Sequence, residues 1–264
     1  MGKLLKYEFL RRKTFLAVMA IVMVLLEAAV LFGIYKGGNW LLASVALTSV
    51  IVIGGLLMPL IDCIANYYSD YRNKHGYMIF LTPNSGYAII GAKALASMII
   101  LVGMLLVVAG SVFASYRLAL SIYPEVVNPV IESMKAQFPA EMLGISPAAA
   151  IAWFSGAALM QYMYNIMLVM LSITLAKTAL PGKQFNAIFA LLFYFGVSMA
   201  VETVNSIVLA GSGFVGDMIR AVSADNPLLI NVGKYLIVGI VMYLIWMAVS
   251  YVVSSILVNR RTDL

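Results

Sequence analysis

Long apolar runs constrain this chain more than any other feature of its sequence. A helix that crosses the hydrocarbon core of a bilayer needs roughly 20 mainly apolar residues, because every backbone polar group must be hydrogen-bonded within the helix. Six segments meet this requirement, at residues 14–35, 40–66, 94–116, 148–176, 185–209 and 235–258. None has the shorter, alternating pattern of a barrel strand. The sequence therefore predicts an all-α integral membrane protein with six transmembrane helices.

The composition agrees with this class and argues against several kinds of site. Hydrophobic residues make up 63% of the 264 positions and charged residues only 11%, which is too apolar for a soluble domain. With one cysteine, Cys63, and one histidine, His75, we expect no disulfide within the chain, no metal site and no Ser-His-Asp triad. The net charge of +6 comes from basic residues beside the apolar runs. We therefore expect contact with lipid headgroups and none with nucleic acid.

The positions of Lys and Arg predict the orientation in the membrane. If the N terminus is cytoplasmic, twelve of the 17 basic residues lie on the inner side, and the outer side holds only Lys36, Arg117, Lys135, Arg220 and Lys234. The first apolar run has membrane length and no evident cleavage motif after it, so we interpret it as a retained helix. We therefore expect a multi-pass protein of the cell membrane, with both termini in the cytoplasm.

Three connections carry patterns of their own. Residues 1–13 mix apolar and basic side chains, as does a helix that lies in the headgroup plane. Residues 117–147 contain four prolines around a short helical pattern, which predicts an ordered outer loop. Residues 210–233 are rich in glycine yet apolar, as in re-entrant helices at the outer face of the membrane.

The connection at residues 67–93 is the most informative. It contains the stretch "HGYMIFLTPNSGYAIIGAK", which predicts a short helix, a turn and a new helix start capped by Ser85. The sequence here resembles the permease subunits of ABC-2 type (type V) ABC transporters, whose corresponding loop has a Gly, an apolar run, Leu-x-Pro, a Ser and a Lys. The matching residues are Gly76, Leu81, Pro83, Ser85 and Lys93. The resemblance extends over the whole chain through the six spans and the order of the connections.

This resemblance implies how the chain would work. In that family the loop is a coupling helix that docks on a cytoplasmic ATPase, and the N-terminal segment is an "elbow" helix. The implied coupling residues are Asp70, Tyr71, Arg72, Gly76, Tyr77, Phe80, Leu81 and Pro83, and the implied elbow residues are Tyr7, Phe9, Arg11 and Arg12. The implied partners are two copies of an ATPase subunit, which would bind ATP and Mg, and a second permease that is a copy or a paralogue.

The chain itself shows no means of hydrolysing ATP. A phosphate-binding P-loop needs Gly, four residues and then Gly-Lys-Ser/Thr. The nearest match, from Gly86 to Gly91, is followed by Ala92 and opens a membrane helix. We therefore expect the chain to hold no cofactor, to be no enzyme by itself and to depend on a separate ATPase polypeptide.

Acidic residues within the spans are candidate functional sites, because a charge in the bilayer must face protein or water. Glu202 shares a helical face with Ser198 and Asn205, and Glu27 lies in the first span. These four residues could line a translocation path, or the two acids could instead lock helices together. Asp62, at the inner end of the second span and near Arg72 in the sequence, is expected to form an ion pair at the membrane interface.

The function that the resemblance implies is an ATP-driven exporter, and we expect its substrate to be amphipathic or hydrophobic, such as a peptide antibiotic, a bacteriocin or a drug-like compound. Methionines at helical spacing in the fourth span, Met160, Met163, Met167 and Met170, suit such a substrate, although ordinary core packing or lipid contact is the simpler explanation for them. Two alternatives stay open. One is an ion- or proton-coupled secondary carrier that uses Glu27 and Glu202, and the other is a membrane sensor or scaffold subunit.

Overall fold

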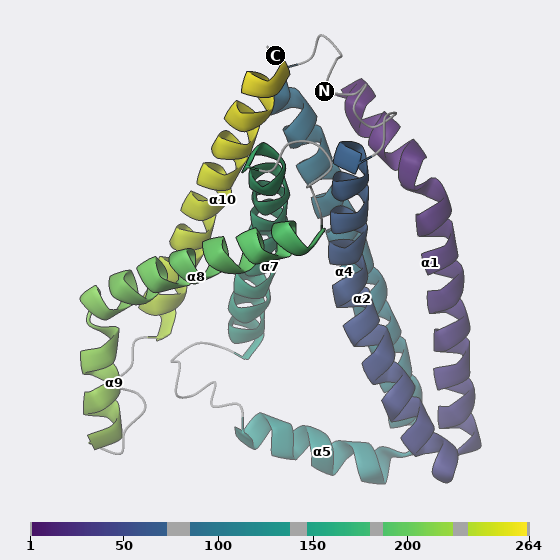
Figure 1. Cartoon of the computed structure of the whole chain (residues 1–264). Coiled ribbons are helices and arrows are strands. Elements are labelled where there is room, and N and C mark those ends of the chain that lie inside the picture. The colour runs from purple at the N-terminus through teal and green to yellow at the C-terminus, as the bar shows by residue number, and fades with distance from the viewer. Residues whose placement is uncertain (1, 73–84, 138–146, 180–186, 224–231, 263–264) are drawn as a thin grey trace. The chain divides into compact units, whose positions relative to one another are not determined.

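The computed structural model describes residues 2–72, 85–137, 147–179, 187–223 and 232–262. Throughout these ranges the chain is helical apart from short turns and caps. The helices are α1 (Gly2–Lys36), α2 (Asn39–Arg72), α4 (Gly86–Ile122), α5 (Pro124–Gln137), α7 (Pro147–Ala179), α8 (Ala187–Gly211), α9 (Phe214–Ser223) and α10 (Val232–Thr262) (Figure 1). The predicted all-α class is thus confirmed for the described residues.

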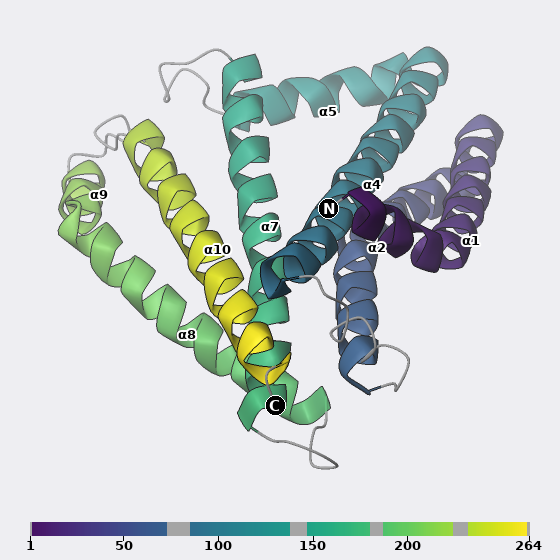
Figure 2. The same cartoon turned by 90° about the horizontal axis from the view of Figure 1, so that it is seen from above.

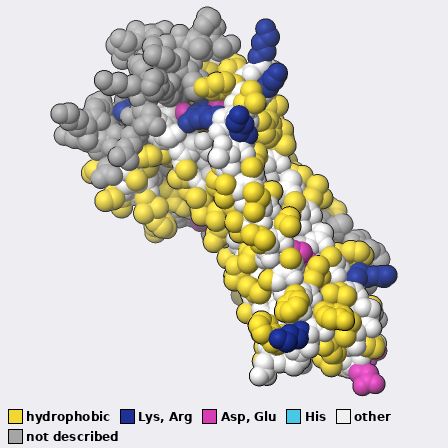
Figure 3. Space-filling model, turned by 90° about the vertical axis from the view of Figure 1, so that its right-hand side faces the viewer, with side chains coloured by type: hydrophobic (Ala, Val, Ile, Leu, Met, Phe, Trp, Pro, Cys, Tyr) yellow, Lys and Arg dark blue, Asp and Glu magenta, His cyan; other side chains and the backbone are white. Residues whose placement is uncertain are grey.

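Six of these helices are long and apolar enough to cross a membrane. The qualifying stretches have a mean hydropathy between 1.5 and 2.8, and they are Gly2–Lys36, Asn39–Tyr71, Gly86–Ile122, Ser155–Ala179, Ala187–Gly211 and Ile237–Asn259. Large apolar side chains such as Val24, Leu25 and Leu106 are at least 65% exposed. On the side of α1, apolar side chains cover the middle of the molecular face and Lys and Arg lie toward its ends (Figure 3). The chain is therefore a multi-pass membrane protein.

Contacts divide the chain into two units, which we describe separately. The first unit comprises Met1–Ala65 and Ala92–Gln137, and the second comprises Asn66–Gly91 and Phe138–Leu264. Both α2 and α4 contribute residues to each unit.

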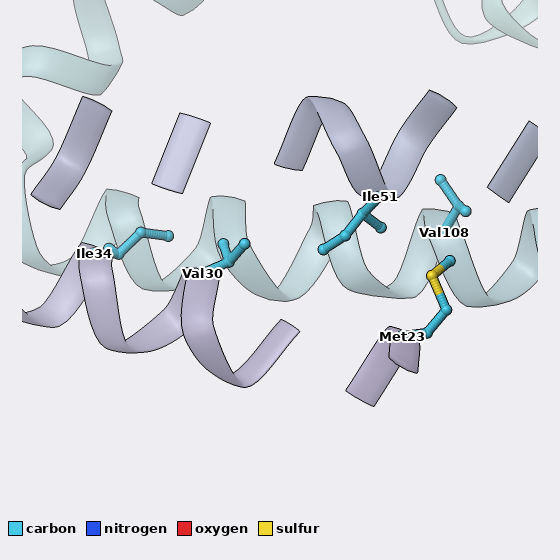
Figure 4. Close-up of a cluster of buried hydrophobic side chains, with 5 residues drawn as sticks. All are labelled: Met23, Val30, Ile34, Ile51 and Val108. Atoms are coloured by element: carbon cyan, nitrogen blue, oxygen red, sulfur yellow. The ribbon is translucent and has the colours of Figure 1, made fainter. Parts of the chain in front are cut away.

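In the first unit, α1 and α2 form a tight helical hairpin. The connection is only Gly37 and Gly38, with φ angles of 71° and 58°, a region that glycine adopts without steric cost. Ser44 of α2 donates a hydrogen bond to the carbonyl oxygen of Val30 across the hairpin. The hairpin and α4 bury an apolar cluster of Met23, Val30, Ile34, Ile51 and Val108 (Figure 4).

Prolines set the boundary between α4 and α5. Helix α4 ends at Ile122, and α5 begins two residues later at Pro124. Proline disfavours a helical residue before it but suits the first turn of a new helix, where its missing N–H needs no partner. Helix α5 turns away from the end of α4 in both views (Figure 2).

In the second unit, α7 is the central helix and contacts both α8 and α10. Its membrane-length stretch is the most buried of the six. Tyr164, Leu168 and Val201 form an apolar cluster with half-buried residues of α8 and α10. Met167 and Met170, two of the methionines noted in the sequence, are at most 2% exposed. Core packing therefore accounts for these two side chains.

The ends of α2 and α4 that border residues 73–84 are held within the second unit. Tyr67 of α2 is hydrogen-bonded to Thr174 of α7 at 2.7 Å. The amide of Gly86, at the start of α4, donates to Asn259 Oδ1 of α10 at 2.6 Å. Ile89 and Ile90 pack with Val258. These contacts fix the residues on both sides of the connection.

Helix α9 follows α8 after a turn through Gly213, which has a φ of 93°. Tyr235, at the start of α10, donates a hydrogen bond to Asp217 of α9 at 2.5 Å and packs edge-on against Phe214. The hydrogen bond to the carboxylate raises the pKa of Tyr235 above its ordinary value. The predicted re-entrant segment thus contains a short helix tied to α10, whereas its insertion into the membrane stays a prediction.

Several boundaries differ from those expected. Helix α4 begins directly after Ser85, as the predicted helix start requires, and it extends beyond the expected span 94–116 at its other end, so residues 117–122 are helical and not loop. Residues 2–13 continue directly into the first span as one helix, although the ribbon of α1 bends near its N-terminal end (Figure 2). The expected spans end near polar residues, but the helices continue past these residues beyond the apolar stretch.

Candidate functional site

Four charged side chains are buried together in the first unit, where α1, α2 and α4 meet. Glu8 and Arg12 come from α1, Asp62 from α2 and Lys93 from α4, and each side chain is at most 4% exposed. Such residues are almost never fully buried unless they are paired. We call these four residues the charge cluster.

The geometry of the charge cluster consists of two strong ion pairs joined by a weaker one. Lys93 Nζ lies 2.7 Å from Glu8 Oε1, and Arg12 Nη1 lies 2.8 Å from Asp62 Oδ2. Arg12 Nη2 approaches Glu8 Oε2 at 3.6 Å. Arg12 Nη1 also donates to Ser97 Oγ of α4 at 3.1 Å. Two positive and two negative groups are therefore brought together without excess charge.

The local sequence explains how the four residues converge. Glu8 and Arg12 are four residues apart, so they lie one turn apart on the same face of α1. Lys93 and Ser97 have the same spacing on α4. Asp62 lies within a long apolar helix, where a carboxylate requires a partner. The acid and the base on this face of α1 therefore each meet an opposite charge: Glu8 meets Lys93 of α4, and Arg12 meets Asp62 of α2.

Not every polar atom of the charge cluster is satisfied. Glu8 Oε2 and Arg12 Nε are buried and make no hydrogen bond to the described residues. Buried polar networks that are only partly satisfied are sensitive to small displacements, because each remaining bond matters more in a low dielectric. The cluster should therefore respond to movements of α1, α2 or α4.

The charge cluster suits a mechanical role better than a chemical one. Among the described residues, no group of three or more His, Cys, Asp or Glu side chains could hold a metal ion. The acids are already paired with bases, which leaves no free general base. What the arrangement can do is hold three helices in one register, because each buried charge is compensated only while its partner stays in contact.

Two members of this cluster were named from the sequence without their partners. Arg12 was expected in the interfacial N-terminal helix and Lys93 in the loop motif, and in the structure each residue is only 2% exposed. The expected ion pair of Asp62 does exist, and its partner is Arg12. Glu8 was overlooked, although its spacing of four from Arg12 was visible in the sequence.

The other elbow residues have mixed environments. Tyr7 is 53% exposed, whereas Phe9 and Arg11 are half-buried. An exposed tyrosine on the same helix as buried charges is compatible with a segment at the membrane surface. The position of this segment relative to the headgroups stays a prediction.

The predicted coupling residues are described only in part. Asp70 is fully buried, and Tyr71 packs edge-on against Tyr67 with a hydrogen bond between their hydroxyls. Arg72 is the last residue of α2. Ser85 caps α4 as predicted, since its Oγ accepts a hydrogen bond from the amide of Ala88 at 3.3 Å. The remaining residues, Gly76, Tyr77, Phe80, Leu81 and Pro83, lie outside the described residues.

Glu27 has neutral partners within the first unit. Its two carboxylate oxygens accept hydrogen bonds from Ser111 and Ser115 of α4. No Lys or Arg pairs with Glu27 in the part of the chain that the structure describes. The carboxylate thus lies in a spanning helix without a basic partner from those residues.

The other three candidate path residues lie on α8 in the second unit. Glu202 is exposed, and Ser198 is half-buried. Asn205 Oδ1 accepts a hydrogen bond of 2.9 Å from Trp246 Nε1 of α10. Asn205 therefore helps to hold α8 against α10, while the side chain of Glu202 is exposed.

Comparison of the chain with protein-family models, with curated proteins and with solved structures gave no match. The resemblance to ABC-2 permeases therefore rests on the order of the spans and on the loop residues named above. The structure itself shows six helices that are long and apolar enough to span a membrane, together with the charge cluster.

Proposed function

We propose that this chain is the transmembrane permease subunit of an ATP-driven exporter of the ABC-2 type. It would act in the cell membrane of a bacterium, with both termini in the cytoplasm. Its partners would be a second permease subunit and two ATPase subunits that bind ATP and Mg. The substrate would be an amphipathic or hydrophobic compound, and Glu27, Ser198, Glu202 and Asn205 would belong to its path.

The observation that carries the proposal is the charge cluster. Asp62 and Lys93 belong to α2 and α4, the two helices that flank the proposed coupling segment, and their partners Glu8 and Arg12 lie in the first turns of α1. A displacement of the coupling segment would therefore reach α1 through these ion pairs, because separating them would leave buried charges without a partner. A force-transmitting subunit needs such a connection, whereas a scaffold does not.

Residues on either side of the coupling segment support the same role. Tyr67, Gly86 and Ile90 are held by α7 and α10. Firm attachment at both ends would pass a displacement into the spanning helices, because packed helices move as rigid bodies and do not deform continuously.

The test uses the two large aromatic residues proposed to contact the ATPase. We expect Tyr77→Ala and Phe80→Asp to leave the amount of protein in the membrane unchanged but to lower ATPase co-purification and substrate-stimulated ATP hydrolysis, because aromatic anchors dominate such interfaces. Tyr35→Ala is the matched control, since this tyrosine is 76% exposed at the opposite end of α1. Wild-type stimulation in both loop variants would refute the coupling role.

A secondary carrier is the competing function, and the neutral partners of Glu27 favour it. An acid in a spanning helix with only hydroxyl partners is a possible proton or cation site. Purified chain in proteoliposomes distinguishes the two functions. A carrier would transport substrate without ATP when an ion gradient is imposed across the vesicle membrane. The permease should show no such flux in the absence of its ATPase.

A further inference from the structure

A cavity of about 680 Å³ lies in the first unit between α2, α4 and α5, with Ile34 of α1 on its wall. This volume is within the range of small-molecule sites. Its walls are mainly aliphatic, from residues such as Val45, Val52 and Val112. An occupant must therefore be largely apolar.

The hydroxyl groups on the α2 wall are already engaged. Ser44 donates to the carbonyl oxygens of Val30 and Trp40, Thr48 donates to that of Ser44, and Ser49 donates to that of Val45. A hydroxyl has one proton to donate. These side chains consequently offer an occupant no free donor, and polar recognition must come from elsewhere on the wall.

On the α4 side of the cavity, one lining residue is hydrogen-bonded to the carboxylate of Glu27. Ser115 lines the cavity, and its Oγ donates to Glu27 Oε1 at 3.1 Å. Glu27 itself is half-buried just behind this wall, and its partners among the described residues are the hydroxyls of Ser111 and Ser115. The field of a carboxylate that no described base neutralises extends into the apolar cavity, where it is poorly screened.

Two aromatic rings complete the lining. Tyr116, next to Ser115 on α4, and Tyr123, directly after the end of α4, both line the cavity. The face of a tyrosine ring attracts a cation through its quadrupole. Apolar walls, aromatic faces and a nearby carboxylate are together the features that recognise a hydrophobic cation.

We propose that the cavity of the first unit binds a lipophilic organic cation, whose charge is balanced by Glu27 and whose apolar body fills the space between α2, α4 and α5. The site belongs to the isolated chain. Binding at this site does not require an ATPase, a second permease or transport. The binding experiment can therefore fail without contradicting the proposed function, and the proposed function can fail without contradicting the binding site.

The experiment measures equilibrium binding of radiolabelled tetraphenylphosphonium to the detergent-solubilised full chain. Triphenylphosphine oxide serves as an unlabelled competitor, because it has a similar aromatic body without the charge. We expect saturable binding that Glu27→Gln weakens by at least about tenfold, since close charge pairs in an apolar site contribute at least that factor. Glutamine keeps the size of the side chain, its Oε1 can still accept a hydrogen bond from one serine, and its Nε2 can donate to the hydroxyl of the other.

A second pair of variants tests the cavity without changing Glu27. Val112→Trp should fill the space and weaken both the cation and the neutral competitor. Val107→Trp is the matched control, because this residue is 50% exposed on the same helix and does not line the cavity. Monodisperse elution on size exclusion confirms folding of each variant.

The outcomes separate cleanly. Weaker binding of the cation to Glu27→Gln, with unchanged affinity for the neutral competitor, supports the proposal. An absence of saturable binding to the wild-type chain overturns it, as does wild-type affinity in either Glu27→Gln or Val112→Trp. A neutral compound that binds wild-type chain as tightly as the cation would also overturn it, because the carboxylate would then have no part in recognition.

Discussion

At the scale of single residues, the charge cluster shows how a membrane protein can bury four charges. Each ion alone would cost several kcal/mol to remove from water, and the cost is offset only while its partner stays within contact distance. The Lys93–Glu8 and Arg12–Asp62 separations of 2.7 Å and 2.8 Å meet this condition. Loss of one partner should therefore be much more harmful than loss of both.

A double-mutant cycle on one pair tests this expectation. We predict that Lys93→Met alone lowers the free energy of unfolding by about 3–5 kcal/mol, because it leaves Glu8 buried without its closest base. Adding Glu8→Gln should recover part of this loss. The free energy is measured by unfolding the protein in mixed detergent micelles, followed by circular dichroism.

Lys13→Met provides the control for that cycle, since Lys13 is exposed on the same helix as Glu8. It should change the free energy of unfolding by no more than about 0.5 kcal/mol. Strictly additive effects of Lys93→Met and Glu8→Gln would show that the two side chains do not interact as described.

At the scale of secondary structure elements, the two-residue connection between α1 and α2 is the tightest constraint in the first unit. Gly37 and Gly38 both have positive φ angles, but only Gly37 is crowded. A Cβ atom at Gly37 would meet the hydroxyl of Tyr123, whereas one at Gly38 would meet no atom within 4 Å. The hairpin is thus closed by a close approach of Tyr123 as well as by backbone conformation.

This difference predicts unequal costs for the same substitution. Gly38→Ala should destabilise the protein by roughly 1–2 kcal/mol through backbone conformation alone. Gly37→Ala should cost clearly more, because the new methyl group also displaces Tyr123. Thermal unfolding in detergent measures both, and Tyr123→Phe should restore part of the stability of Gly37→Ala. Equal losses at the two glycines would contradict the packing described here.

At the scale of the whole molecule, the sequence predicted the spans well and the site poorly, for physical reasons. A spanning helix is required by the thickness of the bilayer, so a run of about 20 apolar residues suffices to locate it. The pairs Arg12–Asp62 and Lys93–Glu8 join residues 50 and 85 positions apart. Which opposite charges meet depends on how the helices pack, and no local pattern specifies that.

The same reasoning applies to the cavity and to the path residues. Glu27 was recognisable as a carboxylate in an apolar run, but its serine partners lie 84 and 88 residues away on α4. Glu202 and Asn205 share a face, as predicted, yet Asn205 contacts Trp246 while Glu202 is exposed. Sequence spacing determines which residues share a face of a helix, and packing determines what that face contacts.

The central claim is that an ATPase on the inner side of the membrane contacts the segment between α2 and α4. Site-specific photo-crosslinking in intact cells tests it most directly, with a benzophenone amino acid replacing Tyr77 and, as the control, Tyr35. We predict that the reagent at residue 77 gives an adduct with a polypeptide containing a P-loop, identified by mass spectrometry, and that the reagent at residue 35 gives none. Adducts at residue 77 with lipid alone, or with no ATP-binding protein, would contradict the account.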